Sequence, residues 1–256
     1  MIDAARPLVV KLGGTTIAEE RGVLAELAAL SEDRAVVVVH GGGRRLTAWL
    51  SRLGLESHFR DGRRVTDDDT LEVALAVLRG VINAELVVAL IDMGARSVGV
   101  SGVDGSTLTG ARDPALGRVV THPRADARFL RTLVASGYLP VVAPLALDET
   151  GSICNVNADD AAAAVASTLG AAFILLTDTD GVYDADRVRM PELTPAETER
   201  LIDRGVIAGG MVPKVRAASS SLSDAGSVAV IADGRVAGAL ARALADPEFG
   251  TRFRPA

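Results

Sequence analysis

Lysine occurs at only two positions in this sequence, Lys11 and Lys214, whereas every other basic residue is an arginine. Lysine carries a compact ammonium group on a flexible stem, while arginine carries a wide planar fork. A site that must place a point charge against one oxygen atom would therefore keep lysine in a chain that otherwise uses arginine. Phosphoryl transfer has this need, because positioned cations and backbone N–H groups stabilise the charge on the moving group. The alternative is that both are ordinary surface lysines.

Glycine-rich segments stand beside both lysines and after a second apolar run. They are Lys11-Leu12-Gly13-Gly14, His40-Gly41-Gly42-Gly43 and Gly209-Gly210-Met211-Val212-Pro213-Lys214. Glycine lets the backbone approach an anion, and a helix that follows offers free N–H groups. The first two segments match neither the P-loop nor the Rossmann fingerprint. Each of them could also be a plain strand-to-helix turn.

Two like charges in one site need a carboxylate between them, and Asp159 is the candidate. It ends the segment Asn155-Val156-Asn157-Ala158-Asp159, just before an alanine-rich stretch. Asp159 could instead be an ordinary acidic residue at a helix N-terminus. The three histidines show no ligand spacing with Cys154, so we expect no metal site in the protein. His40 and Cys154 are interpreted as structural residues.

Short apolar runs alternate with helical patterns along most of the chain. This alternation predicts an α/β protein with a largely parallel sheet covered on both faces, a three-layer α/β/α sandwich. The expected strands are Leu8–Val10, Ala35–Val39, Ser97–Val100, Pro140–Ala143, Phe173–Leu176 and Val228–Ile231, and the expected helices include Arg21–Leu30, Leu46–Leu53 and Thr70–Met93.

Helix ends are marked by polar residues and glycines. Thr66 is the expected N-cap of the helix that follows it, with Asp67, Asp68 and Asp69 in its first turn. Gly94 and Gly170 stand where C-terminal caps are expected. A soft boundary near residue 170 divides the chain into an N-terminal lobe, residues 1–170, and a C-terminal lobe, residues 171–256.

Composition excludes several classes of function. The net charge is −6, with 27 basic and 33 acidic residues, which argues against a nucleic-acid partner. A single cysteine fits a reducing compartment. The longest apolar stretch, Ala161–Leu176, is interrupted by Gly170 and is too short to span a membrane. We therefore expect a cytoplasmic protein with no secretory signal and no membrane partner.

In their order along the chain, the motifs resemble those of the amino acid kinase family. The resemblance extends from Val9 to about Arg252, and its fold matches the sandwich expected above. It rests on Lys11–Gly14, His40–Gly43, Asp61-Gly62-Arg63-Arg64-Val65-Thr66, Asn155–Asp159, Thr177-Asp178-Thr179-Asp180-Gly181-Val182-Tyr183 and Gly209–Lys214. The blocks at Arg64–Thr66 and Asn155–Asp159 favour members that phosphorylate the side-chain carboxylate of N-acetyl-L-glutamate in arginine biosynthesis.

The resemblance also implies a role for each matching residue. Lys11 and Lys214 would stabilise the phosphoryl group in transfer, and Asp159 would orient both lysines. Arg64 would bind the α-carboxylate of the acceptor through its bidentate fork, with Asn155 assisting. The glycines would contribute backbone groups: Gly13 and Gly14 near the γ-phosphoryl group, Gly42 and Gly43 at the acceptor.

The co-substrate implied by the resemblance is ATP, which would bring Mg²⁺ on its phosphates with few protein ligands. The C-terminal lobe would bind it, while the N-terminal lobe would bind the acceptor and form the dimer contact. The nucleotide pocket would be lined by Asp178, Gly181, Val182, Tyr183, Val206, Ile207 and Ala208.

Departures from the family pattern leave alternatives open. Arg44 stands where many relatives have proline, and Arg63 where many have leucine. Both add positive charge near the acceptor site, which is also compatible with a sister kinase for another carboxylate or carbamate, such as carrier-linked aminoadipate. A third possibility is a sensor without catalysis, against which the paired lysines argue. The chain begins almost at its first strand, where arginine-regulated relatives have an extra helix, so the resemblance implies a homodimer without arginine feedback.

Overall fold

The computed structural model describes residues 2–13 and 17–255. Its central feature is an eight-stranded sheet. Every neighbouring pair of strands is parallel except β16 and β17. The order across the sheet is β15 (Glu192–Leu193), β17 (Thr251–Phe253), β16 (Ala229–Asp233), β12 (Ala172–Thr177), β1 (Leu8–Leu12), β2 (Val36–His40), β9 (Leu139–Ala143) and β5 (Ser97–Ser101). The predicted, mostly parallel α/β sheet is thus confirmed.

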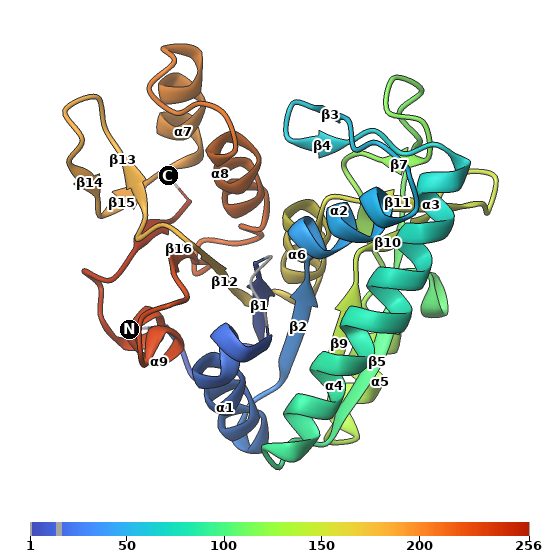
Figure 1. Ribbon diagram of the computed structural model, residues 1–256. Helices are drawn as coiled ribbons and strands as arrows, with labels where there is room; N and C mark the ends of the chain where they lie inside the picture. The colour runs from blue at the N-terminus through green and yellow to red at the C-terminus, as the bar shows by residue number, and fades with distance from the viewer. Residues whose placement is uncertain (1, 14–16, 256) are drawn as a thin grey trace.

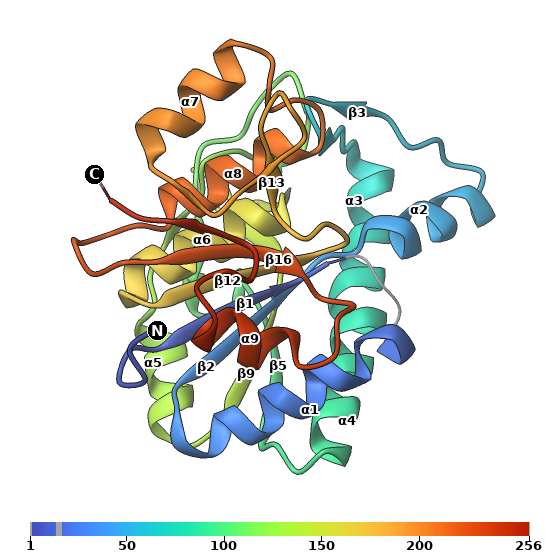
Figure 2. The ribbon, with the colours of Figure 1, turned by 90° about the vertical axis from the view of Figure 1, so that its left-hand side faces the viewer.

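Helices cover both faces of this sheet, as Figures 1 and 2 show. One face packs against α1 (Ile17–Asp33), α2 (Gly43–Arg52), α4 (Asn83–Asp92) and α9 (Ala239–Ala245). The other packs against α5 (Arg128–Ala135), α6 (Ala158–Leu169) and α8 (Met211–Ser220). Alternate residues of β1 divide between these two cores, since Leu8, Val10 and Leu12 join the first and Val9 joins the second.

A second, five-stranded sheet lies beside the main one and was not predicted from the sequence. Its order is β7 (Val119–Val120), β11 (Ile153–Val156), β10 (Leu145–Leu147), β6 (Leu108–Thr109) and β8 (Arg124–Ala125). Strands of two to four residues are too short to show a period of two in the sequence. Between β5 and β6 the chain makes a short 3₁₀ turn, η2 (Asp104–Ser106).

A single continuous helix runs from Asp68 to Asp92, but its middle is wider than an α-helix. It consists of α3 (Asp68–Leu75), a π-helical segment η1 (Ala76–Ile82) and α4. The predicted N-cap, Thr66, was wrong. The Asp67 carboxylate accepts from the Thr70 N–H at 2.8 Å and caps the helix, whereas Thr66 is fully buried in a bridge to Gly117.

The same helix is apolar and long enough, by length and composition alone, to cross a membrane. Core helices of soluble proteins pass the same test. Here Leu78, Leu86 and Leu90 are buried against the sheet, and 39% of the most apolar part of the helix is buried.

The expected helix end at Gly170 and the expected strand Phe173–Leu176 are confirmed. Gly170 ends α6 with a φ of 62°, in the left-handed region that favours glycine. Gly94 follows the last residues of α4 with a φ of 95°. The remaining elements are two hairpins and one helix: β3 (Phe59–Arg60) with β4 (Arg63–Arg64), β13 (Val182–Tyr183) with β14 (Arg189–Met190), and α7 (Pro195–Asp203).

Candidate active site

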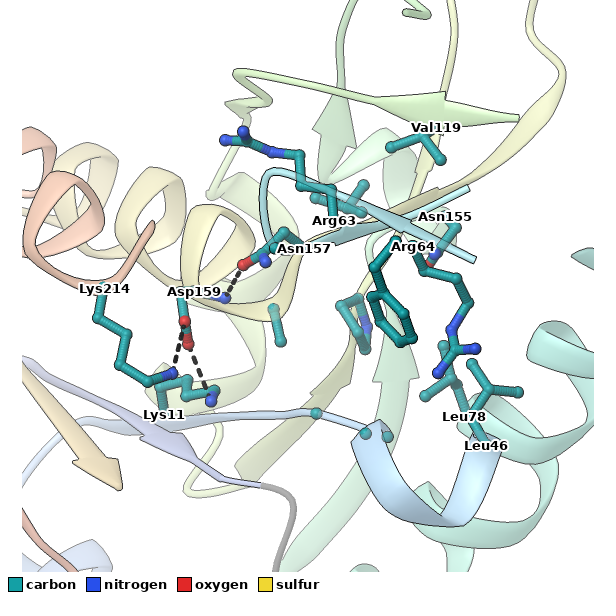
Figure 3. Close-up of a pocket in the computed structure, with 18 residues that line it drawn as sticks. Lys11, Leu46, Arg63, Arg64, Leu78, Val119, Asn155, Asn157, Asp159 and Lys214 are labelled. Carbon is teal, nitrogen blue, oxygen red and sulfur yellow. Dashed lines mark hydrogen bonds and ion pairs between the residues drawn. The ribbon is translucent and has the colours of Figure 1, made fainter. Parts of the chain in front are cut away.

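Lys11 and Lys214, which are 203 positions apart in the chain, bind the same carboxylate. Lys11 Nζ lies 2.8 Å from Asp159 Oδ1, and Lys214 Nζ lies 3.2 Å from Asp159 Oδ2. Figure 3 shows the two ammonium groups reaching Asp159 from different elements. All three side chains border one cavity. The predicted convergence of the lysines on Asp159 is therefore found.

The alternation of side chains along β1 explains which face of the sheet the Lys11 side chain points to. Val9 points into the core beneath α6 and α8, and Lys11 stands two residues further along β1, so it points to the same side. Asp159 lies in the first turn of α6, where a carboxylate is favoured by the helix dipole. Lys214 lies in the first turns of α8, which begins directly after Gly210.

Asn157 fixes the start of α6 and hence the position of Asp159. Its side-chain oxygen accepts from the backbone N–H groups of Asp159 and Asp160, at 2.8 and 3.3 Å. This is the usual N-cap arrangement for asparagine.

The Asp159 carboxyl is ionised despite its burial. Burial by itself raises its pKa, but the charges of Lys11 and Lys214 outweigh this effect and hold the pKa below its ordinary value. The carboxylate thus keeps two ammonium groups in one site without neutralising either completely. An incoming phosphate oxygen can then share both of them.

The Gly41–Gly43 segment forms another wall of the cavity. Gly42 is the N-cap of α2 and Gly43 its first residue, so their N–H groups are among those without a partner inside the helix. A Cβ atom on Gly42 would lie 2.2 Å from Leu78 Cδ2. A side chain at this position would therefore have to displace Leu78 of η1.

A two-residue hairpin turn carries Arg63 and Arg64 to the cavity. Asp61 and Gly62, with φ values of 49° and 75°, form the turn between β3 and β4, as expected for an Asp-Gly pair. A Cβ on Gly62 would be 3.1 Å from Pro213 Cγ. This turn of the N-terminal half therefore packs against α8 of the C-terminal half.

The two arginines of β4 have different partners. Arg63 binds Asp160 at 2.8 Å. Arg64 donates to Ser57 Oγ and, at 2.8 Å, to Thr47 Oγ1, and its guanidinium lies 4.6 Å from the centre of the Phe59 ring. Within the described residues Arg64 has no acidic partner, so its charge remains available to a bound anion.

The cavity has a volume of about 280 Å³ and extends from the lysines to Arg64. Figure 3 shows Lys11 and Lys214 at one side and Arg64 at the other. Asn155, whose amide donates to Thr66 Oγ1 at 3.2 Å, also borders it. The remaining described lining residues are Gly41, Gly42, Gly43, Leu46, Phe59, Gly62, Arg63, Leu78, Val119, Pro144, Val156, Asn157 and Ala158. With four cations and Asp159 as the acid among them, the lining suits an anionic ligand.

The residues predicted for the nucleotide lie elsewhere. Asp178 follows β12, Val182 and Tyr183 form β13, and residues 206–208 connect α7 to α8. Gly181 has a φ of 148°, and a Cβ there would lie 2.6 Å from Thr251 Oγ1. Gly13 directly follows β1, and a Cβ there would lie 3.3 Å from the Leu176 carbonyl oxygen. None of these borders the cavity, and Gly14 lies outside the described residues.

Several residues of the site were not found from the sequence. Thr47 and Ser57, which hold Arg64, are generic polar residues with no motif around them. Phe59 and Leu78 are apolar residues, and nothing in the sequence around them indicates a role other than packing. The aspartate–glycine pair before Arg63 was the one local feature that could have predicted the hairpin.

Comparison with known proteins agrees with the motifs. The model of the amino acid kinase family matches residues 6–233. This chain belongs to the amino acid kinase family. It is 47% identical over 251 residues to acetylglutamate kinase of Rubrobacter xylanophilus, with 97% of each chain covered. It is 45% identical to acetylglutamate kinase of Solibacter usitatus, covering 96% of this chain and 98% of that one.

The fold of the family is also seen in a solved structure. N-acetylglutamate synthase from Neisseria gonorrhoeae matches with a TM-score of 0.82 and 23% identity, covering 98% of this chain and 60% of that one. At this identity the likeness concerns the fold alone. The family and its sequence relatives make the chain a kinase, an enzyme that uses ATP as its co-substrate.

Proposed function

We propose that this enzyme transfers the γ-phosphoryl group of ATP to the side-chain carboxylate of N-acetyl-L-glutamate, giving N-acetylglutamyl 5-phosphate and ADP in arginine biosynthesis. The observation that carries the proposal is the pair of lysines on Asp159, at one side of a cavity that has Arg64 at the other. The acceptor has two carboxylates, and the cavity offers cations at both sides. The sequence relatives named above are acetylglutamate kinases.

The acceptor lies with its α-carboxylate on Arg64. The planar fork of arginine suits bidentate binding of a carboxylate, and Thr47 and Ser57 already hold the fork in place. Asn155 and the N–H groups of Gly42 and Gly43 bind the rest of the molecule. The reacting carboxylate then faces Lys11 and Lys214.

The transfer itself needs charge stabilisation rather than a covalent intermediate. As the phosphoryl group leaves ADP, Lys11 and Lys214 contact its oxygens, and Asp159 holds both ammonium groups in position. Gly13 and Gly14 donate N–H bonds near the γ-phosphoryl group. The acceptor carboxylate needs no general base, because it is already ionised at neutral pH.

ATP binds in the C-terminal lobe, residues 171–256, and residues 1–170 form the acceptor lobe. Asp178, Gly181, Val182 and Tyr183, with residues 206–208, line the nucleotide pocket. Mg²⁺ arrives on the phosphates of ATP and keeps much of its water shell. The contact of Gly62 with Pro213 joins the two lobes beside the acceptor.

The enzyme is proposed to be a cytoplasmic homodimer that associates through α4. The outer face of α4 exposes Val88 and Ile91, by 58% and 52%, and only 39% of the most apolar part of the helix Asp68–Asp92 is buried. The neighbouring β5 is the last strand of the main sheet. Sedimentation should give a dimer, and Val88→Glu with Ile91→Glu should give a monomer; a wild-type monomer or hexamer would contradict this.

A panel of acceptors tests the activity. ADP release is measured with N-acetyl-L-glutamate, L-glutamate, N-acetyl-L-aspartate, carbamate and an amino-blocked 2-aminoadipate. The proposal expects the highest kcat/KM with N-acetyl-L-glutamate. Turnover with another acceptor alone would identify a sister kinase, and nucleotide binding without any turnover would identify a sensor.

A further inference from the structure

A buried polar chain connects the Gly41–Gly43 wall of the cavity to the long helix behind it. His40 is 1% exposed and Asn83 is fully buried. His40 Nδ1 lies 3.0 Å from the Gly41 carbonyl oxygen, and Asn83 Nδ2 lies 3.2 Å from His40 Nε2. The same Asn83 amide donates to the Val141 carbonyl at 2.8 Å, and its oxygen accepts from Arg79 at 3.2 Å.

These contacts allow only one neutral form of the His40 ring. The Gly41 carbonyl can only accept, so Nδ1 must carry the proton. Nε2 is then the acceptor, and it faces the Asn83 amide, which is a donor. Burial lowers the pKa of His40 to about 4, so the ring is neutral at physiological pH.

The ring determines where an N–H of the cavity wall points. The Gly41 carbonyl and the Gly42 N–H belong to the same planar, trans peptide unit, and they therefore point in opposite directions. A hydrogen bond that holds the carbonyl oxygen on the His40 side fixes the Gly42 N–H on the other side. Asn83 therefore acts on this N–H through His40, without bordering the cavity.

Two further close contacts constrain the positions of Asn83 and of the Gly41–Gly43 segment. A Cβ on Gly99 of β5 would lie 2.1 Å from Asn83 Oδ1, so a side chain there would force the amide to move. The π-helical segment η1 ends directly before Asn83 and places Leu78 against Gly42. Such π-helical segments occur frequently at functional sites. Here η1 packs against the Gly41–Gly43 segment through Leu78. Asn83, the residue directly after η1, reaches the same segment by its hydrogen bond to His40.

We propose that His40 and Asn83 are positioning residues for the phosphoryl acceptor: Asn83 fixes the His40 tautomer, and His40 fixes the Gly41–Gly42 peptide that faces the acceptor. The inference rests on the proposed function, because it takes Gly41–Gly43 as the acceptor wall. Neither side chain touches the reacting atoms.

Three variants test this chain of contacts. Asn83→Leu removes the donor to His40 with little change of volume. His40→Asn keeps a donor near the place of Nδ1, and His40→Gln keeps a polar group near Nε2 alone. Leu90→Ala is the control, because Leu90 is fully buried on the same helix, seven residues beyond Asn83, so it should lower stability without the specific effect.

Steady-state kinetics should separate positioning from general damage. We expect Asn83→Leu and His40→Gln to raise the KM of the acceptor by about tenfold, as for one lost hydrogen bond, with the KM of ATP unchanged. His40→Asn should restore most of the acceptor affinity. Equal acceptor KM values in His40→Asn and His40→Gln, or a wild-type value in Asn83→Leu, would overturn the proposal.

A measurement without substrate distinguishes this inference from the proposed function. The chain has three histidines, so the ¹⁵N spectrum of the free enzyme can report the His40 tautomer. Wild type should carry the proton on Nδ1, and Asn83→Leu should show a mixture, with faster amide exchange at Gly42. A proton on Nε2 in wild type would overturn the inference even if N-acetyl-L-glutamate is the acceptor. Failure of the acceptor panel with the expected tautomer and exchange would overturn only the proposed function.

Discussion

Asp159 and Asp160 are neighbours in the first turn of α6, yet they bind different cations, and the pKa values of their carboxyls are displaced in opposite directions. Asp159 binds Lys11 and Lys214, while Asp160 binds Arg63. Burial raises the pKa of both carboxyls. At Asp159 two ammonium groups outweigh it and the pKa falls, whereas at Asp160 the single guanidinium does not, and the pKa stays above its ordinary value.

Asp159→Asn should destabilise the protein at neutral pH. Loss of one partner from a buried ion pair costs about 3–5 kcal/mol, because two ammonium groups remain without a counter-charge. The native pKa of Asp159 is depressed, so its stabilisation is complete above the unfolded value of about 3.9 and is lost as the pH falls through the native value. Urea unfolding should therefore give a constant deficit above about pH 5 that shrinks below about pH 4. A deficit that grew on acidification would contradict the pairing.

Asp160→Asn should show the opposite dependence on pH. A carboxyl with a raised native pKa favours the folded state most below its unfolded pKa, and this contribution is lost as the pH rises through the native pKa. The free energy of unfolding of the variant, relative to wild type, should thus increase from acid to neutral pH. The same urea titrations measure it, with Asp159→Asn as the matched comparison. Parallel pH curves for the two variants would be inconsistent with the structure.

Lys214→Arg should lower kcat by about 10²–10³-fold, the cost of losing one positioned stabilising group. The wide guanidinium cannot occupy the place of a compact ammonium beside Asp159 and the moving phosphoryl group. ATP affinity, measured by nucleotide titration, should change little. Arg216→Lys is the control on the same helix, since Arg216 is exposed and pairs with Glu199 at 2.9 Å. A near-normal kcat in Lys214→Arg would remove the basis for the proposed site.

The chemically distinctive part of this site could be predicted from the sequence. Lys11 and Lys214 were conspicuous in a chain rich in arginine, and the glycines around them marked strand and helix ends. Asp159 followed from the need for a counter-charge. These inferences depend on residue type and local position, which a sequence shows directly.

The supporting contacts could not be predicted, because they depend on packing between distant segments. Thr47 and Ser57 meet Arg64 only after α2 and the β3–β4 hairpin are in place. Asn83 is a polar residue in an apolar helix, and that contrast could have marked it, but its partner His40 is 43 positions away. The π-helical segment has no signature in hydrophobic periodicity.

Arg64→Ala should raise the KM of the acceptor by about 10–100-fold, the range for a lost hydrogen bond to a charged group. It should lower kcat less, because Arg64 binds a group remote from the reaction. Arg64→Lys should be intermediate, since lysine keeps the charge without the fork. Arg60→Ala is the control, because Arg60 lies on the same hairpin but is exposed and donates to the Ala115 carbonyl at 3.3 Å. Equal acceptor KM values for the Arg60 and Arg64 variants would rule out the proposed orientation.

Gly42→Ala should destabilise the protein by about 1–3 kcal/mol, the usual cost of overpacking a core. The new methyl group would lie 2.2 Å from Leu78 Cδ2, and Leu78 is itself only 2% exposed. Gly41→Ala is the matched comparison, because its Cβ would meet Ala158 at an ordinary 3.8 Å. Urea unfolding should therefore show a lower free energy of unfolding for Gly42→Ala than for Gly41→Ala.

A double-mutant cycle with Leu78→Ala shows whether this contact is the cause. Leu78→Ala alone should cost about 2–5 kcal/mol, as for other buried leucines. In the double variant the smaller side chain makes room for the new methyl group, so the combined cost should be less than the sum of the single costs. Strict additivity would mean that Gly42 is needed for another reason, and the support of the acceptor wall by the helix Asp68–Asp92 would then rest on Asn83 alone.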